Sequence, residues 1–590
     1  MGTARLNIVD PIGGRQPFAH ESGRYIIVFN GEIYNYREIR DDLVNRGCKF
    51  FTNSDTEVLL NAWAFWKEDC LKKLNGGFAF CVYDKLSGEA VIARDRFGKR
   101  PLYYIRDGSG LIFASEMKAF LAYGRFDFAF CPDRLASILR VWAPIGAQTP
   151  FKGISQLPPG CFLKVAGGEV VIGEYASLDL ARAPGGLTDR DWPLLLKERL
   201  RRSVDLRLRC DTEVGVYLSG GLDSAIIASL TVERGQSPVR SFSVSFEDPE
   251  FDESADQALL ASELGTRHTT VQIGSGDIVD NFPEAVWHAE VPTFRTAFVP
   301  MFLLSREVKR HGIKVVLTGE GADEAFLGYD IFKEASLRAD WNILGPQDRM
   351  ARLDMLYPYL PQFAADNMAN LYAMFSRFVA DPDSDFFSHD LRFHNSRQSL
   401  RLLRDKSCSG LEALSQAVSD DRQFHSYDLI QRAQWLEYRT LLSGYLLSTQ
   451  GDRMSLANGV ENRCPFLDPD VIEVALASNL ATYDGVTEKT LLKQAFRDCL
   501  PDRILTKPKQ PYRAPDASVF LEARPDYLDL LLSRAELAKI DVVDPEFCCR
   551  FVDKIRSKEA DQVTQSENQT FIFLLSLVCL QRQFVDHANA

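Results

Sequence analysis

Residues 216–224 read VYLSGGLDS, an apolar run that ends in a Ser-Gly-Gly turn and continues into the apolar helical pattern of residues 225–230. Small residues in such a turn let backbone N–H groups approach phosphate oxygens, and the start of the following helix adds the positive end of its dipole. The Lys of the Walker loop is missing, which argues against an ordinary kinase or motor ATPase. We interpret the stretch as an ATP pyrophosphatase loop. In the alternative interpretation, the glycines serve only a tight strand-turn-helix connection.

The chain is long, acidic and of ordinary globular composition. Its 590 residues exceed the size at which single hydrophobic cores stop growing, so we expect at least two domains. A content of 46% hydrophobic and 25% charged residues is typical of a globular protein rather than of a disordered or membrane protein. The net charge of -13 and the lack of basic runs with interleaved aromatic residues argue against a nucleic-acid partner.

Two further features argue against a membrane and an oxidising compartment. The longest apolar stretch near the C-terminus, residues 571–580, is too short to cross a bilayer and predicts a buried helix. The 12 cysteines lack Cys-x-x-Cys spacing, and adjacent Cys548 and Cys549 do not suit a structural disulfide or a zinc site. The sequence therefore predicts a cytoplasmic protein.

The pattern of the chain changes at a linker of small residues, 182–188. Before it, residues 6–175 show short alternating apolar runs typical of strands, with one helix expected around residues 55–65. After it, helices alternate with buried strands at residues 214–218, 239–246 and 313–317, which is typical of a parallel sheet. Helical patterns dominate beyond residue 347. We therefore predict a β-rich domain over residues 1–187 and an α/β domain with a helical C-terminal half over residues 188–590.

A second strand ends in an acidic turn, KVVLTGEGADE at residues 314–324. Open α/β folds bind ligands at the carboxyl ends of their strands, where Asp223 and Asp323 are expected to meet. Two such carboxylates can hold the Mg²⁺ of ATP, because Mg²⁺ prefers oxygen ligands. Glu320 remains free for proton transfer. In the structural alternative, Asp223 only caps its helix and Glu324 pairs locally.

Six separated motifs resemble those of the asparagine synthetase family, glutamine-dependent amidotransferases. The motifs occur in order over nearly the whole chain: residues 29–35 (FNGEIYN), 93–98 (ARDRFG), 113–118 (FASEMK), the Ser-Gly-Gly loop, the Gly-Glu-Gly turn, and 451–455 (GDRMS) leading to 464–468 (CPFLD). The resemblance implies an N-terminally truncated β-sandwich glutaminase domain of the Ntn type joined to an ATP-pyrophosphatase synthetase domain. It also implies that ATP activates a carboxylate to an acyl-adenylate, pyrophosphate leaves, and ammonia displaces AMP.

The resemblance also implies roles for individual residues of the second domain. Glu320 corresponds to the acid/base that handles the incoming amine, and Lys489 to the cation that stabilises charge at the adenylating centre. Asp223 and Asp323 correspond to the metal ligands. The ATP contacts carried over are Leu218, Ser219, Gly220, Gly221, Asp223, Ser224, Val244, Thr318 and Gly319.

In the first domain, the family uses a cysteine nucleophile at the mature N-terminus, where this chain has Met1 and Gly2. The rest of the site is present. Asn30 and Gly31, expected on an Asn-Gly turn, match the oxyanion hole. The residues that match the grip on glutamine's charged ends are Arg5, Glu32 and Asp55. Retention of these residues favours truncation of the given chain over loss of the activity, and either explanation predicts negligible glutamine hydrolysis by this form.

The carboxylate acceptor is left open by residues 288–300, where the family lines its substrate pocket. Bulky Phe294 and Phe298 flank Arg295, which either binds a substrate carboxylate or forms a structural ion pair. Residues 509–516 (KQPYRAPD) resemble a motif of relatives that amidate specialised metabolites or sugar acids. Aspartate is therefore the first candidate acceptor, and another carboxylate is the second.

Three hypotheses follow from these observations. The first is an ATP-dependent amide-forming ligase that resembles glutamine-hydrolysing asparagine synthetase, with glutamine or ammonia as nitrogen donor. The second is a relative that acts on another carboxylate, including amide closure as in β-lactam synthetases. The third, of a different class, is a non-catalytic binding or regulatory subunit. The family resemblance also makes a homodimer an expectation.

Overall fold

The computed structural model describes all residues of the chain except 109, 181–190, 236–237, 358–367, 378–380 and 588–590. The predicted linker and the predicted domain boundary at residue 187 lie outside the described residues. Among these residues, no helix is long and apolar enough to cross a membrane. All 12 cysteines are free thiols.

The N-terminal half is built on antiparallel sheets, as predicted. One sheet has the order β1-β2-β3-β4-β8-β9 and the other the order β6-β5-β7. Side chains of the two sheets, such as Cys81 and Phe113, meet in one apolar cluster, and helix α2 packs against β2. The strands are β1 (Phe18–Ala19), β2 (Tyr25–Ile33), β3 (Gly76–Asp84), β4 (Ala90–Arg94), β5 (Tyr103–Asp107), β6 (Gly110–Ala114), β7 (Ser155–Gln156), β8 (Cys161–Ala166) and β9 (Glu169–Glu174).

Two details of the N-terminal half differ from the sequence prediction. The predicted helix is present as α2 (Asp55–Trp66), whose first turn is capped by Ser54, but α1 (Tyr36–Asn45) was missed. The expected Asn-Gly turn is wrong, because Asn30 and Gly31 lie inside β2 and pair with β3. The strand continues there because Gly31 adopts a φ of 129°. The other helices of this half are α3 (Cys70–Lys73), α4 (Ala119–Tyr123) and α5 (Pro132–Val141).

The second half contains a five-stranded parallel sheet in the order β12-β11-β10-β13-β14. The three predicted strands are confirmed as β10 (Val214–Tyr217), β11 (Arg240–Phe246) and β13 (Val315–Leu317). The edge strands are β12 (Arg267–Ile273) and β14 (Glu461–Arg463). Strand β14 was missed because its sequence, ENR, is charged and carries no apolar signal.

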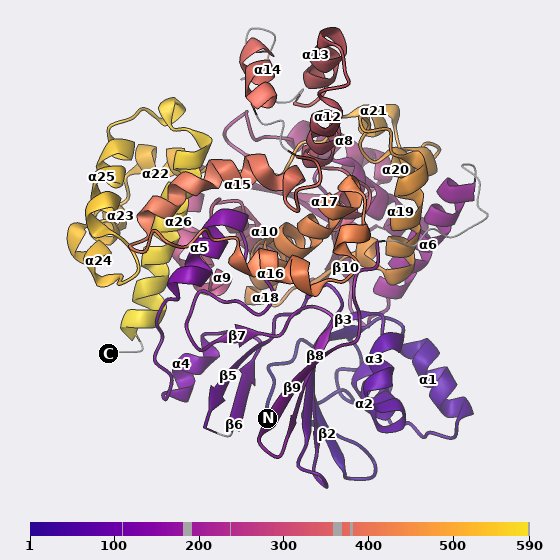
Figure 1. Cartoon of the computed structure of the whole chain (residues 1–590). Coiled ribbons are helices and arrows are strands. Elements are labelled where there is room, and N and C mark those ends of the chain that lie inside the picture. Colours follow the sequence, from indigo (N-terminus) through magenta and orange to yellow (C-terminus); the bar gives the residue numbers. More distant parts are fainter. Residues whose placement is uncertain (109, 181–190, 236–237, 358–367, 378–380, 588–590) are drawn as a thin grey trace.

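Helices cover both faces of this sheet because its side chains alternate between two cores. Val216 and Leu317 point into one cluster with helix α7, whereas Tyr217 and Val316 point into another with α9, α10 and α26. Helix α26 contains the predicted apolar segment and is buried. In Figure 1 the N-terminal sheets lie below this helical half, and α26 runs beside the other C-terminal helices.

The helices of the second half follow the sheet and dominate its C-terminal part, as predicted. They are α6 (Asp191–Arg207), α7 (Leu222–Glu233), α8 (Ser254–Leu264), α9 (Ser275–Ala289), α10 (Phe298–Arg310), α11 (Ala322–Ala325), α12 (Asp330–Asp340), α13 (Pro346–Asp354), α14 (Met368–Arg377), α15 (Asp390–Ser396), α16 (Glu412–Asp420), α17 (Leu429–Glu437), a π-helix η7 (Tyr438–Asp452), α18 (Arg453–Ala457), α19 (Pro469–Thr482), α20 (Thr490–Ala495), α21 (Asp502–Thr506), α22 (Ala517–Ala523), α23 (Asp526–Leu531), α24 (Arg534–Lys539), α25 (Pro545–Arg556), α26 (Gln565–Leu580) and a second π-helix η10 (Gln581–Asp586).

The conformation of Gly31 yields a test of the strand pairing. A Cβ at Gly31 would lie 2.0 Å from the carbonyl oxygen of Gly77, whereas a Cβ at Gly88, which also has a positive φ, would meet nothing within 4 Å. We expect Gly88→Ala to cost about 1–2 kcal/mol of unfolding free energy from backbone strain alone. Gly31→Ala should cost clearly more, because the β2–β3 backbone must also shift. Chemical unfolding followed by circular dichroism measures both, and equal costs would contradict this account.

Candidate functional site

The crevice of the parallel sheet opens where β10 and β13 lie side by side. Strands β11 and β12 extend the parallel sheet on one side of β10, and β13 and β14 extend it on the other, so the direction in which successive strands are added reverses at the β10–β13 boundary. Open α/β sheets bind ligands at such a switch point, outside the carboxyl ends of the strands. The loops after these two strands touch, since a Cβ at Gly319 would lie 3.0 Å from the Cβ of Asp223.

The loop after β10 has the geometry of an anion-binding turn. Gly220 has a φ of 72°, and Gly221 is the extended residue before the first turn of α7. Ser224 supports the turn, because its hydroxyl accepts a hydrogen bond from the Ser219 backbone N–H at 3.1 Å and lies 3.0 Å from the Ser219 hydroxyl. The positive end of the α7 dipole therefore points into the crevice beside this loop.

Two lysines and two aspartates form a compact charge cluster at the same edge. The Lys489 Nζ lies 2.6 Å from Asp223 Oδ2 and 2.6 Å from Asp323 Oδ1. Lys509 adds a second ammonium, with its Nζ 2.6 Å from Asp323 Oδ2. Packing is so close that a Cβ at Gly328 would lie 2.1 Å from Asp323 Oδ1 and 2.3 Å from Lys489 Cε.

The cluster fixes the charge of Asp323. Burial by itself raises the pKa of this carboxyl, but Lys489 and Lys509 outweigh burial and hold the pKa at about 2. Asp323 is therefore an anion at neutral pH. The sequence singled out Lys489 but not Lys509. Its loop position carries no periodic signal, so only the fold brings Lys509 to the cluster.

Glu320 lies beyond the cluster, after β13. Its Oε2 has no hydrogen-bond partner among the described residues, and burial raises its pKa above the ordinary range. Nearby Thr318 is buried and donates a hydrogen bond from its hydroxyl to Cys464 Sγ at 3.5 Å. Val244, the residue expected to contact adenine, lies on β11, and its carbonyl accepts a hydrogen bond from Gln257 Nε2 at 3.0 Å.

Glu324 pairs locally with Tyr329, although it lies close enough to Asp323 for that charge to act on its pKa. It is fully buried on α11, and its Oε1 accepts a hydrogen bond from the Tyr329 hydroxyl at 2.9 Å. Burial raises the pKa of Glu324 to about 8. This agrees with the local pairing that was the structural alternative for Glu324.

A small cavity connects Glu320 with the N-terminal half. It offers room for about one water-sized molecule. Lys99, from the N-terminal half, lines it together with residues of the second half: Thr318, Glu320, Leu446, Leu447, Gly451, Asp452, Asn462 and Cys464. The cavity therefore lies at the junction of the two halves.

Among the residues predicted to bind glutamine, Asp55 and Glu32 lie next to each other, whereas the Arg5 guanidinium is hydrogen-bonded to the backbone. Asp55 and Glu32 are neighbours, because the charge of Asp55 helps to raise the pKa of Glu32 after burial itself. The Asp55 carboxylate accepts a hydrogen bond from the Ile33 N–H at 3.1 Å, and burial raises its pKa to about 6. Arg5 lies near enough to lower that pKa, but its guanidinium donates to the backbone carbonyl of Val9 at 2.5 Å.

Asn30 and Gly31 occupy the middle of β2 beside a third motif of the sequence. The side-chain amide of Asn30 donates to the Ser115 hydroxyl at 3.2 Å. Glu32, on the same strand, faces the second half, with its carboxylate 3.4 Å from the Arg463 guanidinium. Glu32 is thus also a contact between the halves, which the sequence did not reveal.

Buried ion pairs, all missed from the sequence, join the two halves. Arg100 pairs with Asp452, and its second nitrogen lies 2.8 Å from Glu461 Oε2. Arg463 lies 2.8 Å from the same Glu461 side chain, on β14. Burial raises the pKa of Asp452 to about 7 although Arg100 opposes this shift.

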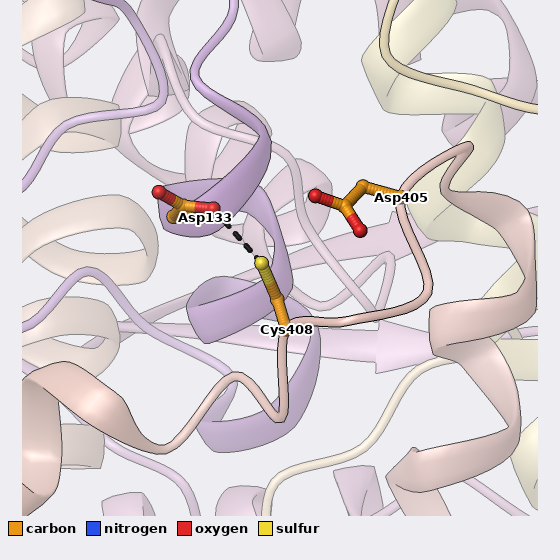
Figure 2. A group of neighbouring side chains, drawn as sticks. All are labelled: Asp133, Asp405 and Cys408. Atoms are coloured by element: carbon orange, nitrogen blue, oxygen red, sulfur yellow. Dashed lines mark hydrogen bonds between the residues drawn. The ribbon is translucent and has the colours of Figure 1, made fainter.

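Figure 2 shows a further group of side chains, formed by Asp133 on α5 with Asp405 and Cys408 on one loop. The Cys408 thiol donates a hydrogen bond to Asp133 Oδ1 at 2.9 Å. That hydrogen bond, more than burial, raises the pKa of Cys408 to about 11. Since metals bind thiolates, this protonated thiol between two exposed carboxylates does not fit a metal centre.

Comparison with known proteins assigns both halves. Residues 195–578 match the family model "Asparagine synthase", and residues 1–176 match "Glutamine amidotransferase domain". Asparagine synthetase [glutamine-hydrolyzing] 1 of Bacillus subtilis is 31% identical over 521 residues, covering 87% of this chain and 79% of that protein. Asparagine synthetase [glutamine-hydrolyzing] 3 of the same organism is 27% identical, covering 97% and 87%. "Amidase chyE" of Penicillium rubens is 28% identical, covering 87% and 81%.

Glu324 generates a prediction about stability and pH. Its pKa rises from an ordinary 4.5 to about 8 on folding, so the folded state keeps a proton that the unfolded state releases. The stability of the wild type should therefore fall between these two pH values, by up to about 1.4 kcal/mol per pH unit from this group. Glu324→Gln cannot ionise, so its unfolding free energy relative to the wild type should increase from pH 5 to pH 7.5. Glu522→Gln, at an exposed position, is the control, and a pH-independent difference for Glu324→Gln would contradict the assignment.

Proposed function

Because the chain belongs to the asparagine synthase family and carries an N-terminal glutamine amidotransferase domain, we propose that it uses ATP to convert a carboxylic acid into an amide. The carboxylate attacks the α-phosphorus of ATP, which forms an acyl-adenylate and releases pyrophosphate. Ammonia then attacks the acyl carbon and AMP leaves. Aspartate, which would give asparagine, is the first candidate acceptor because two of the relatives carry the name asparagine synthetase.

One observation carries this proposal: the cluster of Lys489, Asp223 and Asp323 lies beside the Ser-Gly-Gly loop in the sheet crevice. The loop backbone and the α7 N-terminus favour an anion, and Lys489 supplies a positive charge where a pentacovalent phosphorus develops. The residues that we assign to ATP are Leu218, Ser219, Gly220, Gly221, Asp223, Ser224, Val244, Thr318 and Gly319.

Mg²⁺ fits this cluster through the two aspartates. Asp223 Oδ1 is buried and has no hydrogen-bond partner in the described parts of the chain, and Asp323 is ionised at neutral pH. Carboxylate oxygens are the ligands that Mg²⁺ prefers. When bound, the ion would neutralise part of the phosphate charge.

Glu320 suits the proton transfer of the second step. Ammonia becomes positively charged when it attacks the acyl carbon, and a proton must leave before AMP departs. The Oε2 of Glu320, which has no hydrogen-bond partner among the described residues, is available to accept it, and burial raises the pKa of this carboxyl, which strengthens it as a base.

The nitrogen is proposed to come from glutamine or from free ammonia. For glutamine, Asn30 and Gly31 would stabilise the oxyanion, while Arg5, Glu32 and Asp55 would bind the charged ends of the substrate. Ammonia would reach Glu320 through the cavity between the halves, whose single-molecule size suits it. The free thiols suit the reducing cytoplasm predicted from the sequence.

A second candidate function, amidation of a larger carboxylic acid, is favoured by unpaired groups beyond Glu320. The hydroxyls of Tyr445 and Tyr512 are buried without hydrogen-bond partners in the described residues. Arg295 stacks on Trp142 at 5.7 Å but has no ion pair within the same described set. Aspartate also has a second carboxylate for Arg295, but an acceptor with a longer aromatic or polar chain would satisfy the two tyrosine hydroxyls better. A relative of about the same coverage carries the name amidase.

Removing Lys489 tests the main proposal. We expect Lys489→Met to lower acid-dependent pyrophosphate release about 10²–10³-fold, because a preorganised charge at the reacting phosphorus is lost. Lys507→Met is the control, since Lys507 pairs instead with Glu253 and Asp256. Purified protein is assayed with Mg-ATP, ammonium and aspartate or other acids, and mass spectrometry identifies the amide. If the wild type released no pyrophosphate with any acid, the binding-subunit hypothesis would be favoured. A biological effect that persists in Asp223→Ala would favour it as well.

The acceptor is tested by Tyr445→Phe across the same panel of acids. If the Tyr445 hydroxyl binds the acceptor, KM for the true acceptor should rise about 2- to 10-fold, as expected for one lost hydrogen bond. Tyr527→Phe removes a hydroxyl that donates to the Val279 carbonyl elsewhere, and it should leave KM unchanged. An aspartate-only enzyme with an unaltered KM in Tyr445→Phe would contradict the larger-acceptor hypothesis.

A further inference from the structure

Lys99 is a buried cation that has no ion-pair partner among the described residues. It lies in the loop between β4 and β5, is 3% exposed, and lines the same cavity as Glu320. Within the described residues its Nζ forms neither a hydrogen bond nor an ion pair, and it lies 5.4 Å from the centroid of the Tyr34 ring. Its backbone N–H, in contrast, is fixed by Asp95 Oδ1 at 3.0 Å. The loop is thus anchored at its backbone, and the residue lines the cavity.

The surroundings of Lys99 make the cavity selective by charge. Burial, and then Arg207, lower the pKa of Lys99 to about 8, with Arg100 acting in the same direction and Asp95 and Cys464 against it. The amine is therefore still mostly an ammonium at neutral pH. Glu320 and Asp452 line the same space of about one small molecule, and Asp452 is already paired with Arg100.

Without Lys99, the carboxylate of Glu320 would favour a small cation in the cavity. Ammonia is mainly protonated at neutral pH, so most of this nitrogen donor is present as the ammonium cation. Ammonium has no lone pair and cannot attack the acyl carbon. Its entry would occupy the route that the neutral nucleophile needs.

We propose that Lys99 is a charge filter that admits neutral ammonia to the Glu320 side of the cavity and repels ammonium. Neutral ammonia can accept a hydrogen bond from the Lys99 ammonium through its lone pair, whereas ammonium meets a like charge and finds no donor-acceptor match. Lys99 is thus a specificity-determining residue for the nitrogen donor. This inference rests on the proposed function for its biological meaning, but its physical content is the exclusion of small cations.

A competing explanation is that Lys99 only packs on Tyr34. Its side chain also lies near Gly77, where an added Cβ would be 3.5 Å from Lys99 Cε. A packing role predicts that substitutions change stability equally in every salt. A filter predicts a response to the identity of the cation, which packing alone does not produce.

The test compares thermal unfolding in potassium chloride and in choline chloride at equal ionic strength. Potassium has nearly the size of ammonium and choline is too large for the cavity. The wild type and Lys99→Arg, which keeps the charge, should have the same Tm in both salts. Lys99→Met should have a higher Tm in potassium, because a cation that binds only the native state stabilises it. Lys99→Gln is the second neutral variant if Lys99→Met does not fold.

Equal Tm values in the two salts for the folded neutral variant would overturn the filter. An activity measurement gives a second readout: potassium should inhibit ammonium-driven pyrophosphate release several-fold in Lys99→Met and not in Lys99→Arg. The two proposals fail separately. A wild type without pyrophosphate release would refute the proposed function, whereas the salt comparison of Tm would still decide the role of Lys99.

Discussion

The Lys489 ammonium is the interaction on which the arrangement of the crevice depends. It bridges Asp223 after β10 and Asp323 after β13, and thereby joins the ends of two strands to a segment far along the chain. Lys489 itself adopts a positive φ of 53° at the start of α20, a conformation that is uncommon outside glycine. Removing one partner of a buried pair typically costs about 3–5 kcal/mol, since the remaining charge is left uncompensated. The fold therefore holds the two carboxylates close together and keeps Asp323 ionised.

A second set of charges fixes the crevice relative to the N-terminal half. Strand β14 contributes Glu461 and Arg463, which meet Arg100 and Glu32 of the other half. Strand β14 pairs with β13, and Glu320 follows β13 in the chain. A shift of these ion pairs would therefore also move the strand that precedes Glu320. Buried ion pairs contribute little net stability, but they penalise alternative alignments strongly. We therefore interpret these ion pairs as the contacts that set the alignment of the two halves and the shape of the cavity between them.

The sequence predicted those parts of the structure that local chemistry determines. The apolar runs of β10, β11 and β13 and the Ser-Gly-Gly loop were found because each carries its own pattern. Strand β14 and helix α1 were missed, because a charged three-residue strand gives no hydrophobic signal and α1 lies within a β-rich stretch. The sequence around Lys509 could not predict its place in the cluster, because only the fold brings Lys509 next to Asp323. The Asn30–Gly31 turn was wrong because pairing with β3 overrides the turn preference of the dipeptide.

Several buried polar groups without hydrogen-bond partners among the described residues belong to the proposed binding sites for the nucleotide, the amine and the acid. Asp223 Oδ1, Glu320 Oε2 and the Tyr445 hydroxyl are all buried without hydrogen-bond partners in the described structure, and each such group costs about 1–3 kcal/mol. The two cores that cover the faces of the parallel sheet are large enough to offset such costs. A fold selected for stability alone would pair these groups. Their unpaired state in the crevice is what a bound nucleotide, an amine and an acid would satisfy, so the instability of the free site is a source of affinity for its ligands.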